Sequence, residues 1–259
     1  MTTVQLATGQ LPRRLEAIGW ARPVYVRGAA PSDGPAVAIV GARAASGPAM
    51  TRATDLAREL AVRGFHIVSG GALGIDGAAH RGALAGGGTT TVVLGNGLDI
   101  AYPARHASLF RDVVARGGGL AGLAPDGVPP RRAMFPQRNP LIAALADAVI
   151  VVEADVRSGS LSTANAGRRF GRLVAAYPGS RGCDRLLATG AALVEGAGDV
   201  ELALAGSPRR PARPALDATA EQVRAAIAAG ARGVDQIVRA TGLTVRAVLR
   251  ALPMLERFS

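Results

Sequence analysis

The chain of 259 residues contains no lysine, so all 30 of its Lys and Arg positions are arginines. The absence of lysine excludes a phosphate-binding loop that ends in Gly-Lys-Ser/Thr, a pyridoxal Schiff base and a lysine nucleophile. Cysteine is almost absent too: the single Cys183 excludes an internal disulfide and a multi-cysteine zinc or iron–sulfur cage. The three histidines are far apart in the sequence. We therefore expect no metal site.

Long uncharged apolar runs are also lacking. The longest apolar stretch, 141–152, is interrupted by Asp147, and the first residues show no charged segment that precedes an apolar one. We expect neither a signal peptide nor a membrane span. Together with the single cysteine, this predicts a cytoplasmic protein.

Acidic residues are scarce relative to arginine, and the formal charge is +11. Most of the excess lies in residues 1–206, with a further three arginines in the short segment 207–216. A basic surface of this kind suits a polyanion, because the planar guanidinium offers several donors to phosphate oxygens. The alternative is that arginine simply replaces lysine on an ordinary solvated surface.

Short runs rich in Val, Ile and Ala recur along the first part of the chain, and helical stretches follow them. They occupy 36–41, 66–70, 90–95, 148–154 and 173–179. Continuous apolar runs that alternate with helices indicate buried parallel strands. One helix is bounded clearly, from Ser46-Gly47-Pro48 to about Arg63. The pattern predicts an α/β fold with a doubly wound, mostly parallel, Rossmann-like sheet over residues 1–206.

The segment 207–216 contains three prolines, so we expect an extended, exposed linker. Residues 217–259 then show three short apolar-periodic segments, at 221–229, 234–240 and 244–252. The TGLT turn at 241–244 supplies a glycine stop followed by a threonine cap. This predicts a small helical C-terminal module of the helix-turn-helix or degenerate winged-helix type. Its low net charge leaves a protein-docking role at least as favoured as DNA reading.

The predicted strands end in loops of small residues: 41–47, 69–76, 95–103 and 153–164. Backbone N–H groups at helix N-termini in such loops form anion sites, so the sequence favours phosphate binding along one edge of the sheet. A dinucleotide is disfavoured, because Gly41, Arg43 and Ser46 stand where the Rossmann fingerprint needs three glycines. We expect no cofactor.

Aromatic residues are few, nine in all, yet Phe135 lies among Arg131, Arg132 and Arg138 in the stretch 129–139. We interpret this stretch as a loop in which an unpaired base stacks on the ring, which contributes ~1–3 kcal/mol. The alternative is that Phe135 anchors the loop to the core.

Two groups of residues could suggest catalysis. Ser69, Asp76 and His80 lack the Gly-x-Ser-x-Gly elbow of a hydrolase, and the spacing of Asp76 and His80 favours fixing the loop onto its helix. Glu153 could be the general base of a nucleotide hydrolase, but a role as partner of Arg43 or Arg138 is favoured. Neither group predicts an enzyme.

In order and spacing, the motifs resemble those of the DprA/Smf family of DNA-processing proteins from about Leu11 to Ala205. VAIVGARAAS resembles the family's Gly-Ser-Arg-x-x-Ser block, and IVSGGALGIDGAAHRGAL matches its Ser-Gly-x-Ala-x-Gly-Ile-Asp block almost in full. LGNGLDIAYP, FPQRN, VVEADVRSGSLSTA and YPG follow in the expected order.

The resemblance implies a homodimer without catalytic turnover that binds single-stranded DNA. Such a protein protects incoming DNA during natural transformation and loads the RecA recombinase. Phe135 would be the stacking ring, and Arg157 and Arg172 would keep positive charge where the family often has lysine. The phosphate-holding residues would be Gly41, Arg43, Ser46, Ser69, Gly70, Gly74, Arg138, Asn139, Ser158, Gly159 and Ser160.

The chain departs from the family pattern at a few positions. Pro140 replaces an arginine after the FPQRN block, Asp184 stands where asparagine is usual, and 120–125 lack the usual Ser-Glu. The chain ends before a β-wing is expected to form, which makes duplex reading by the C-terminal module a disfavoured function. Two further hypotheses stay open: a nucleotide-binding sensor or nucleoside monophosphate hydrolase of related fold, and a C-terminal module that recruits a protein partner.

Overall fold

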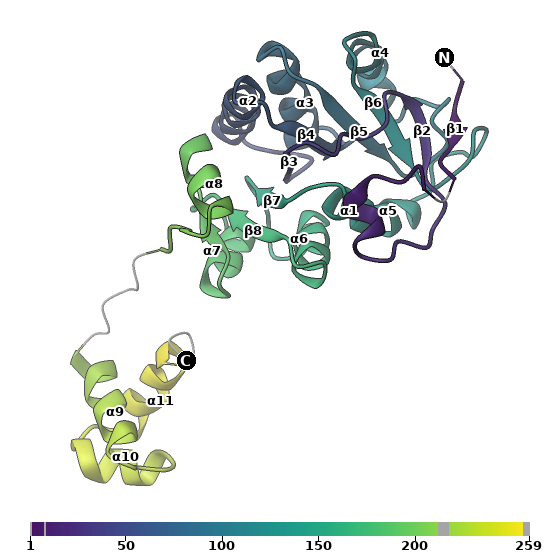
Figure 1. The fold of residues 1–259 in the computed structure, drawn as a ribbon. Coiled ribbons are helices and arrows are strands. Elements are labelled where there is room, and N and C mark those ends of the chain that lie inside the picture. Colours follow the sequence, from purple (N-terminus) through teal and green to yellow (C-terminus); the bar gives the residue numbers. More distant parts are fainter. Residues whose placement is uncertain (1, 8, 212–217, 256–259) are drawn as a thin grey trace. The chain divides into compact units, whose positions relative to one another are not determined.

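The computed structural model describes residues 2–7, 9–211 and 218–255. The chain forms two compact units, Met1–Arg210 and Pro211–Ser259 (Figure 1). The expected linker 207–216 begins inside the first unit: the Leu193 amide donates to the Arg209 carbonyl, and the Arg209 side chain forms ion pairs with Glu195 and Asp199. Its start is therefore held against the first unit and is not free, while 212–216 lie outside the described residues.

The first unit is built on one sheet with the strand order β1-β2-β6-β5-β4-β3-β7-β8-β9. Its parallel strands are β3 (Ala36–Val40), β4 (His66–Gly70), β5 (Thr90–Leu94), β6 (Gly119–Gly122), β7 (Ala148–Val151), β8 (Leu173–Ala176) and β9 (Ala192–Leu193). The short strands β1 (Val4–Gln5) and β2 (Tyr25–Gly28) add to the β6 edge in antiparallel orientation. The predicted doubly wound, mostly parallel sheet is confirmed.

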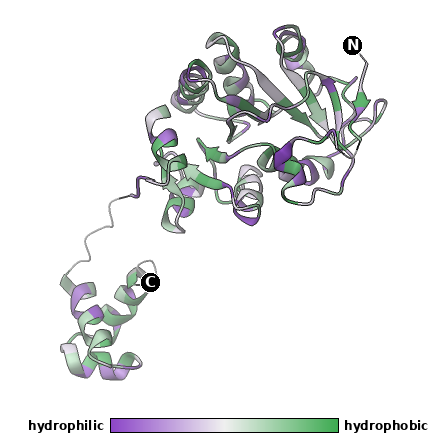
Figure 2. Ribbon diagram, in the orientation of Figure 1, coloured by the Kyte–Doolittle hydropathy of each residue, from purple (hydrophilic) through white to green (hydrophobic). Residues whose placement is uncertain are grey.

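Helices cover both faces of this sheet (Figure 1). One face carries α2 (Gly47–Val62), α3 (Ile75–Ala85), η1 (Ala104–His106), α4 (Ala107–Ala115) and α8 (Ala197–Leu204), and the other carries α1 (Arg13–Glu16), α5 (Met134–Ala144), α6 (Ser160–Arg169) and α7 (Arg181–Ala188). Strand residues alternate between the two cores: Val37 and Ile39 pack with α2 and α3, whereas Ala38 and Val40 pack with α5 and α6. The strands are apolar on both faces for this reason, as Figure 2 shows.

The boundaries of α2 follow from its sequence. Ser46 is the N-cap, its hydroxyl oxygen accepts from the Ala49 amide, and Pro48 lies in the first turn. Gly64 ends the helix with φ of +85°, a conformation in which glycine avoids the steric cost of a Cβ. The expected helix from Ser46 to about Arg63 is therefore present.

Several elements gave no clear sequence signal. β6 reads Gly-Leu-Ala-Gly and lacks β-branched residues, and its glycines allow close packing: a Cβ on Gly119 would collide with the backbone of Ala29. β1, β2 and β9 have two to four residues each, too short for a period to be visible.

The second unit contains α9 (Ala218–Ala228), α10 (Val234–Thr241) and α11 (Val245–Leu255) around a small core that includes Val223, Ile237 and Val248. Gly242 adopts the left-handed conformation at the end of α10, and the Thr244 hydroxyl accepts from the Ala247 amide. The glycine stop and threonine cap expected in the TGLT turn are present. Within its described part this unit contains no strand. The expectation that no β-wing forms concerns the segment after α11, and residues 256–259 there lie outside the described residues.

No helix in the described part of the chain has the length and apolar character that a membrane span requires.

Candidate nucleic-acid interface

A cleft of about 530 Å³ lies at the carboxyl ends of the parallel strands. It opens beside β3 and β7, where the strand order reverses direction, which is the usual ligand site of a doubly wound sheet. The lining residues are Val40, Gly41, Arg43, Ala72, Asp76, Arg132, Phe135, Pro136, Arg138, Asn139, Ile142, Ser158, Gly159, Ser160 and Thr163. The structure thus brings together many of the residues predicted from the sequence.

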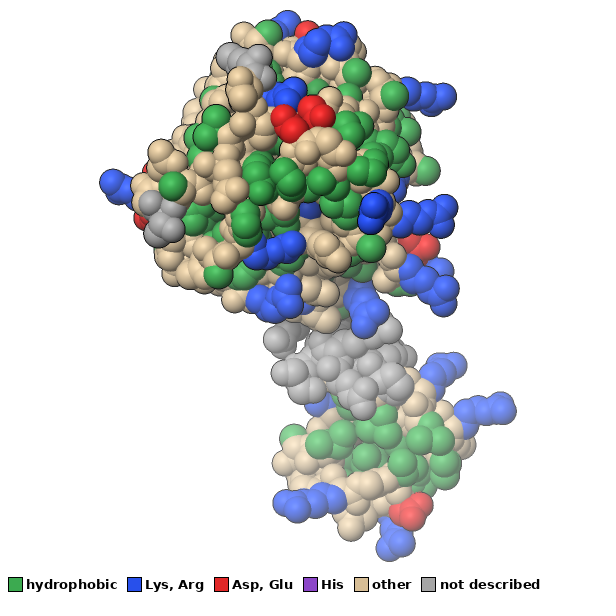
Figure 3. All heavy atoms as spheres, turned by 90° about the vertical axis from the view of Figure 1, so that its right-hand side faces the viewer, with side chains coloured by type: hydrophobic (Ala, Val, Ile, Leu, Met, Phe, Trp, Pro, Cys, Tyr) green, Lys and Arg blue, Asp and Glu red, His purple; other side chains and the backbone are tan. Residues whose placement is uncertain are grey.

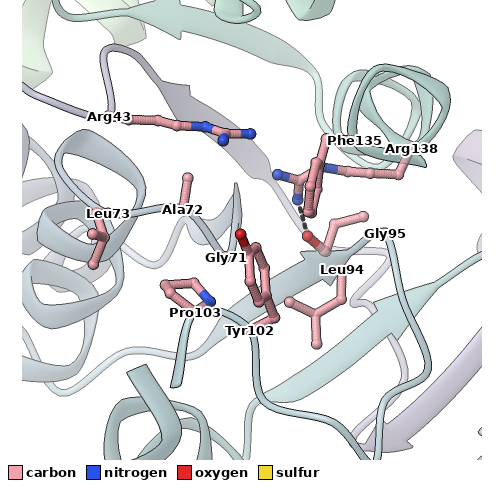
Figure 4. Close-up of a pocket in the computed structure, with 11 residues that line it drawn as sticks. Arg43, Gly71, Ala72, Leu73, Leu94, Gly95, Tyr102, Pro103, Phe135 and Arg138 are labelled. Carbon is pink, nitrogen blue, oxygen red and sulfur yellow. Dashed lines mark hydrogen bonds between the residues drawn. The ribbon is translucent and has the colours of Figure 1, made fainter. Parts of the chain in front are cut away.

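A smaller pocket of about 110 Å³ adjoins the cleft (Figure 4). Its walls are Gly71, Ala72, Leu73, Val93, Leu94, Gly95, Tyr102 and Pro103, together with Arg43, Phe135 and Arg138. Because Arg43, Ala72, Phe135 and Arg138 line both spaces, they form the boundary between the cleft and this pocket. We call the larger space the cleft and the smaller one the side pocket.

The rings at this boundary lie close together. Phe135 and Tyr102 stack with their centroids 5.5 Å apart and their planes at 20°, and the guanidinium carbon of Arg43 lies 5.1 Å from the centroid of Phe135. Phe135 lies in the first turn of α5 and not in a loop as expected, and it is only partly buried. It therefore presents a ring to the cleft and does not act simply as a core anchor. Tyr102 was not among the predicted site residues, although an aromatic residue in the glycine-rich loop 95–103 of a chain with only nine aromatics was a usable signal.

Arg138 is buried, with 5% of its surface exposed. Its Nη1 donates to the Val93 carbonyl, its Nη2 lies 3.9 Å from Asp76 Oδ2, and its Nε has no partner among the described residues. Burial raises the pKa of Asp76 and lowers that of Arg138 to about 10, which leaves the guanidinium charged at neutral pH. A Cβ on Gly70 would collide with both side chains, so Gly70 makes room for this buried pair. These positions do not support direct phosphate contacts by Arg138 or Gly70.

The backbone amide and the hydroxyl of Ser46 both bind Glu153. The backbone amide of Ser46 donates to Glu153 Oε1 at 3.0 Å, and its hydroxyl donates to Oε2 at 2.6 Å. A carboxylate therefore already fills the anion position at the α2 N-terminus. The expectation that Glu153 pairs with Arg43 or Arg138 is wrong, because its hydrogen-bond partner is Ser46.

The N-terminus of α6 faces the cleft through Ser158, Gly159 and Ser160. The Ser158 and Ser160 hydroxyl oxygens lie 2.7 Å apart. Asn139 is buried and donates from Nδ2 to the Gly159 carbonyl at 3.1 Å and to the Ser162 hydroxyl at 2.7 Å. Asn139 thus positions this helix end, and the partial positive charge of the helix N-terminus points into the cleft.

Two of the predicted glycines are needed for close packing of the backbone. A Cβ on Gly41 would collide with Ile75, and a Cβ on Gly74, where φ is +76°, would collide with the carbonyl oxygens of Ala42 and Arg43. Both positions therefore shape the loop that carries Arg43.

Ser69, Asp76 and His80 do not form a catalytic arrangement. The Ser69 hydroxyl donates to the Ile39 carbonyl at 2.5 Å and is fully buried, so it cannot reach a phosphate. The His80 Nε2 donates to the Gly70 carbonyl at 2.9 Å, which ties α3 to β4 as the spacing suggested. Burial lowers the pKa of His80 to about 3, so the imidazole is neutral at physiological pH.

Arg157 and Arg172, which stand where the family often has lysine, lie outside the cleft lining. Arg157 is exposed in the loop before α6. Arg172 precedes β8 at the amino end of the sheet, opposite to the cleft, where its Nη2 donates to the carbonyls of Arg14 and Ala144. Arg172 therefore braces the N-terminal segment and does not contribute to the cleft. In the described residues no group of three or more His, Cys, Asp and Glu could hold a metal ion.

The fold defines a Rossmann-like α/β protein with a cleft at the switch point of its sheet. The chain belongs to the DNA recombination-mediator protein A family: the family model matches residues 3–205, and residues 207–256 match the DprA winged helix domain.

Relatives agree with this assignment. A Mycobacterium tuberculosis protein named for the DNA processing protein DprA is 46% identical over 237 residues, which cover 85% of this chain and 60% of the relative. Protein Smf of Escherichia coli is 44% identical over 164 residues, which cover 61% of this chain and 44% of the relative. The chain therefore spans about half to three fifths of the length of these relatives.

Two solved structures are similar to the fold. DprA from Streptococcus pneumoniae has a TM-score of 0.69 at 35% identity and covers 77% of this chain and 73% of its own. The DprA structure from Helicobacter pylori has a TM-score of 0.69 at 28% identity and covers 81% of this chain and 98% of its own; its title describes a single-stranded DNA binding mode.

Proposed function

We propose that this protein binds single-stranded DNA along the cleft. The observation that carries the proposal is the arrangement of Arg43, Arg132, Phe135 and the α6 N-terminus around one open cleft. Guanidinium groups and a helix N-terminus bind phosphates, and a partly exposed ring binds a base. An unpaired strand offers both, whereas the bases of a duplex are paired and stacked. The single-stranded DNA binding named for the H. pylori relative supports the same ligand.

Electrostatics favour a polyanion at this cleft. Within the described part of the chain Arg43 forms no ion pair with a carboxylate, and it is exposed. Of the acidic groups at this edge, Asp76 faces Arg138, and Glu153 accepts two hydrogen bonds from Ser46. Figure 3 shows a different side of the first unit, the one that carries β1 and β2 in Figure 1, and there too the blue basic side chains are more numerous than the red acidic ones. Phosphates would therefore meet donors that are not already neutralised.

Family membership supports a wider role for the strand-binding site. We infer that the protein has no catalytic turnover, protects incoming single strands in natural transformation, and helps to load the RecA recombinase. We also infer that it acts as a homodimer in the cytoplasm, with the second unit as the element that recruits a protein partner. The motif order in the first unit and the match of the second unit to the family's winged helix domain support this role.

Charge removal tests the proposed strand path. Arg43→Ala and Arg132→Ala should each weaken binding of a fluorescent oligonucleotide severalfold. Each should also reduce the slope of log K against log salt by about 0.7, the value for one phosphate on a single strand. Arg169→Ala is the matched control, because this exposed arginine lies at the C-terminal end of α6, away from the cleft. Unchanged binding in both cleft variants, or an equal loss in the control, would contradict the assigned path.

Removal of the Phe135 ring should affect binding differently from removal of an arginine. Phe135→Ala should weaken binding without altering the salt slope, because stacking neutralises no phosphate. A changed slope would show that the ring positions the charge of Arg43 instead.

The hydrolase alternative is disfavoured, because both oxygens of its candidate base, Glu153, accept hydrogen bonds from Ser46. Incubation with nucleoside monophosphates should release no free base. Steady release that Glu153→Gln abolishes would overturn the binding account.

A further inference from the structure

We propose that α11 of the second unit is a docking face for an acidic, amphipathic segment of a partner protein. Two exposed apolar side chains, Val245 and Leu249, would pack against the apolar side of that segment, and Arg246 and Arg250 would pair with its carboxylates. This inference rests on the proposed function, in which the second unit recruits a protein partner, and it names the surface and the chemistry of that recruitment.

The inner face of α11 packs into the small core of the second unit. Val248 and Ala251 are buried there, and Leu252 and Leu255 pack against the same core. Spacings of three and four residues place these side chains on one face of the helix. The core therefore fixes which side of α11 points outward.

A second apolar pair on α11 lies outside this core. Val245 is 49% exposed and Leu249 is 52% exposed, and because they are four residues apart they lie one above the other on the helix surface. Figure 3, seen from the side on which α11 lies in Figure 1, shows hydrophobic side chains gathered on this face of the second unit with basic side chains around them. The helix α11 therefore presents apolar surface that α9 and α10 leave uncovered, which is typical of an interaction site.

Basic side chains border the apolar pair. Arg246 and Arg250 are exposed, and each directly follows one member of the pair in the sequence. Neither forms an ion pair within the described part of the chain, and the sequence of α11, VRAVLRALPML, contains no acidic residue. An apolar centre with an unpaired basic border complements a segment that carries Asp or Glu beside its apolar side chains.

The same residues are poorly suited to a DNA duplex. In a helix-turn-helix unit the helix after the turn lies in the major groove, where arginine and amide side chains read the base edges. Val245 and Leu249 offer the bases an apolar contact alone, which only the methyl group of thymine matches. Removal of these two side chains from water favours association with a protein surface instead.

The experiment titrates fluorescent helical peptides into the full chain and measures their anisotropy at two salt concentrations. The test peptide carries leucines four residues apart with a glutamate beside each. One control peptide has lysine in place of every glutamate, and another has serine in place of every leucine. The proteins are the wild type, Leu249→Ser, Arg250→Glu and Arg250→Lys. Val4→Ser and Arg169→Glu make the same kinds of change at exposed positions of the first unit.

The acidic leucine peptide should bind the wild type more tightly than either control peptide does, and salt should weaken its binding because exposed ion pairs are screened. Leu249→Ser and Arg250→Glu should each weaken this binding roughly tenfold. Arg250→Lys keeps the charge, so it should bind as the wild type does, and so should both first-unit controls. The α11 variants should keep the helical circular dichroism signal and the oligo-dT affinity of the wild type.

Equal binding of the acidic leucine peptide by the wild type, Leu249→Ser and Arg250→Glu would overturn the docking face. Absence of peptide binding by the wild type would overturn it as well. In that case a duplex affinity that Arg250→Glu reduces would make α11 a DNA-reading helix, and a dimer that Leu249→Ser dissociates in ultracentrifugation would make a second copy of the chain the occupant.

Failure of the proposed function gives a different result. If Leu249→Ser and Arg250→Glu lose the peptide but recruit RecA to coated strands as the wild type does, the docking face stands and RecA is excluded as its partner. Failure of the wild type to bind any single strand would refute the strand binding alone, because the peptide titration contains no DNA.

Discussion

At the level of single residues, the loop that carries Arg43 depends on two backbone segments that touch at Gly74. The Ile75 amide donates to the Ala42 carbonyl at 3.2 Å, and Gly74 takes a φ of +76° beside it. The position of the loop that carries Arg43 therefore depends on the absence of a side chain at Gly74.

Gly74→Ala should reduce both stability and strand binding. The backbone conformation alone, φ of +76° with ψ of −128°, costs about 1–3 kcal/mol for a residue with a Cβ, and collision with the Ala42 and Arg43 carbonyls adds to it. Gly127→Ala is the matched control, because Gly127 has a φ of +81° but nothing within 4 Å of a Cβ. Urea denaturation should show a larger loss for Gly74→Ala, with weaker oligonucleotide binding in that variant alone. Equal losses would contradict the role of close packing.

The sequence indicated which motifs lie at the cleft, but it did not indicate the direction in which each side chain points. Arg43 and Arg138 look alike in sequence, and both were expected to hold phosphate. The structure exposes Arg43, whereas the helical register of α5 turns Arg138 inward toward Asp76. That register could not be read because Phe135 and Arg138 were expected in a loop.

At the level of elements, helix N-termini at the cleft edge are not equivalent. Glu153 binds the N-terminal turn of α2, and Asp76 in the first turn of α3 accepts from the Ala72 amide, whereas α6 presents Ser158, Gly159 and Ser160 to the cleft. The sequence indicated several glycine-rich loops at one edge of the sheet. It could not show which of them carboxylates from other segments would fill, because those contacts span up to 107 residues.

Buried histidines fasten neighbouring elements. His66 on β4 contacts the Thr89 and Thr91 hydroxyls, each at 2.8 Å, and His80 on α3 contacts Thr90 at 2.7 Å. Burial, with a smaller effect of Arg14, lowers the pKa of His66 to about 4, and burial lowers that of His80 to about 3. Both imidazoles are therefore neutral in the folded protein at pH 5.

The free energy of unfolding should decrease as the pH falls below about 6.5, the ordinary histidine pKa. In this range the unfolded chain binds protons that the folded chain does not, and the loss continues until the folded pKa values are passed. Between pH 8 and pH 5 each of the two histidines should contribute a loss of about 2 kcal/mol. Denaturation of His66→Gln across this range should show a pH dependence smaller by about that amount, whatever its absolute stability. An unchanged pH dependence would contradict the neutral state of His66.

At the level of the whole molecule, the lining residues of the cleft and of the side pocket belong to the first unit. This unit has its own hydrophobic cores. The alternation of apolar strands with helices made the fold of this unit predictable. The short edge strands and the ion-paired start of the linker were not predictable, because they depend on contacts between residues that are far apart in the sequence.

Deletion of residues 217–259 should leave the affinity for a single strand within about twofold of the full chain, because a compact unit with its own core can fold alone. Recruitment of RecA to coated strands should decrease in the same truncated protein. Pull-down on immobilised single strands measures both. Loss of strand binding would show that the second unit contributes to the interface.

The most direct test of the account is an anisotropy titration of the full chain with a single-stranded oligonucleotide and with its duplex, each at low and moderate salt. The cleft predicts tighter binding of the single strand, with an affinity that falls as salt rises by a slope of about −0.7 per phosphate contacted. Equal affinity for the two forms, or single-strand binding that salt does not weaken, would contradict it.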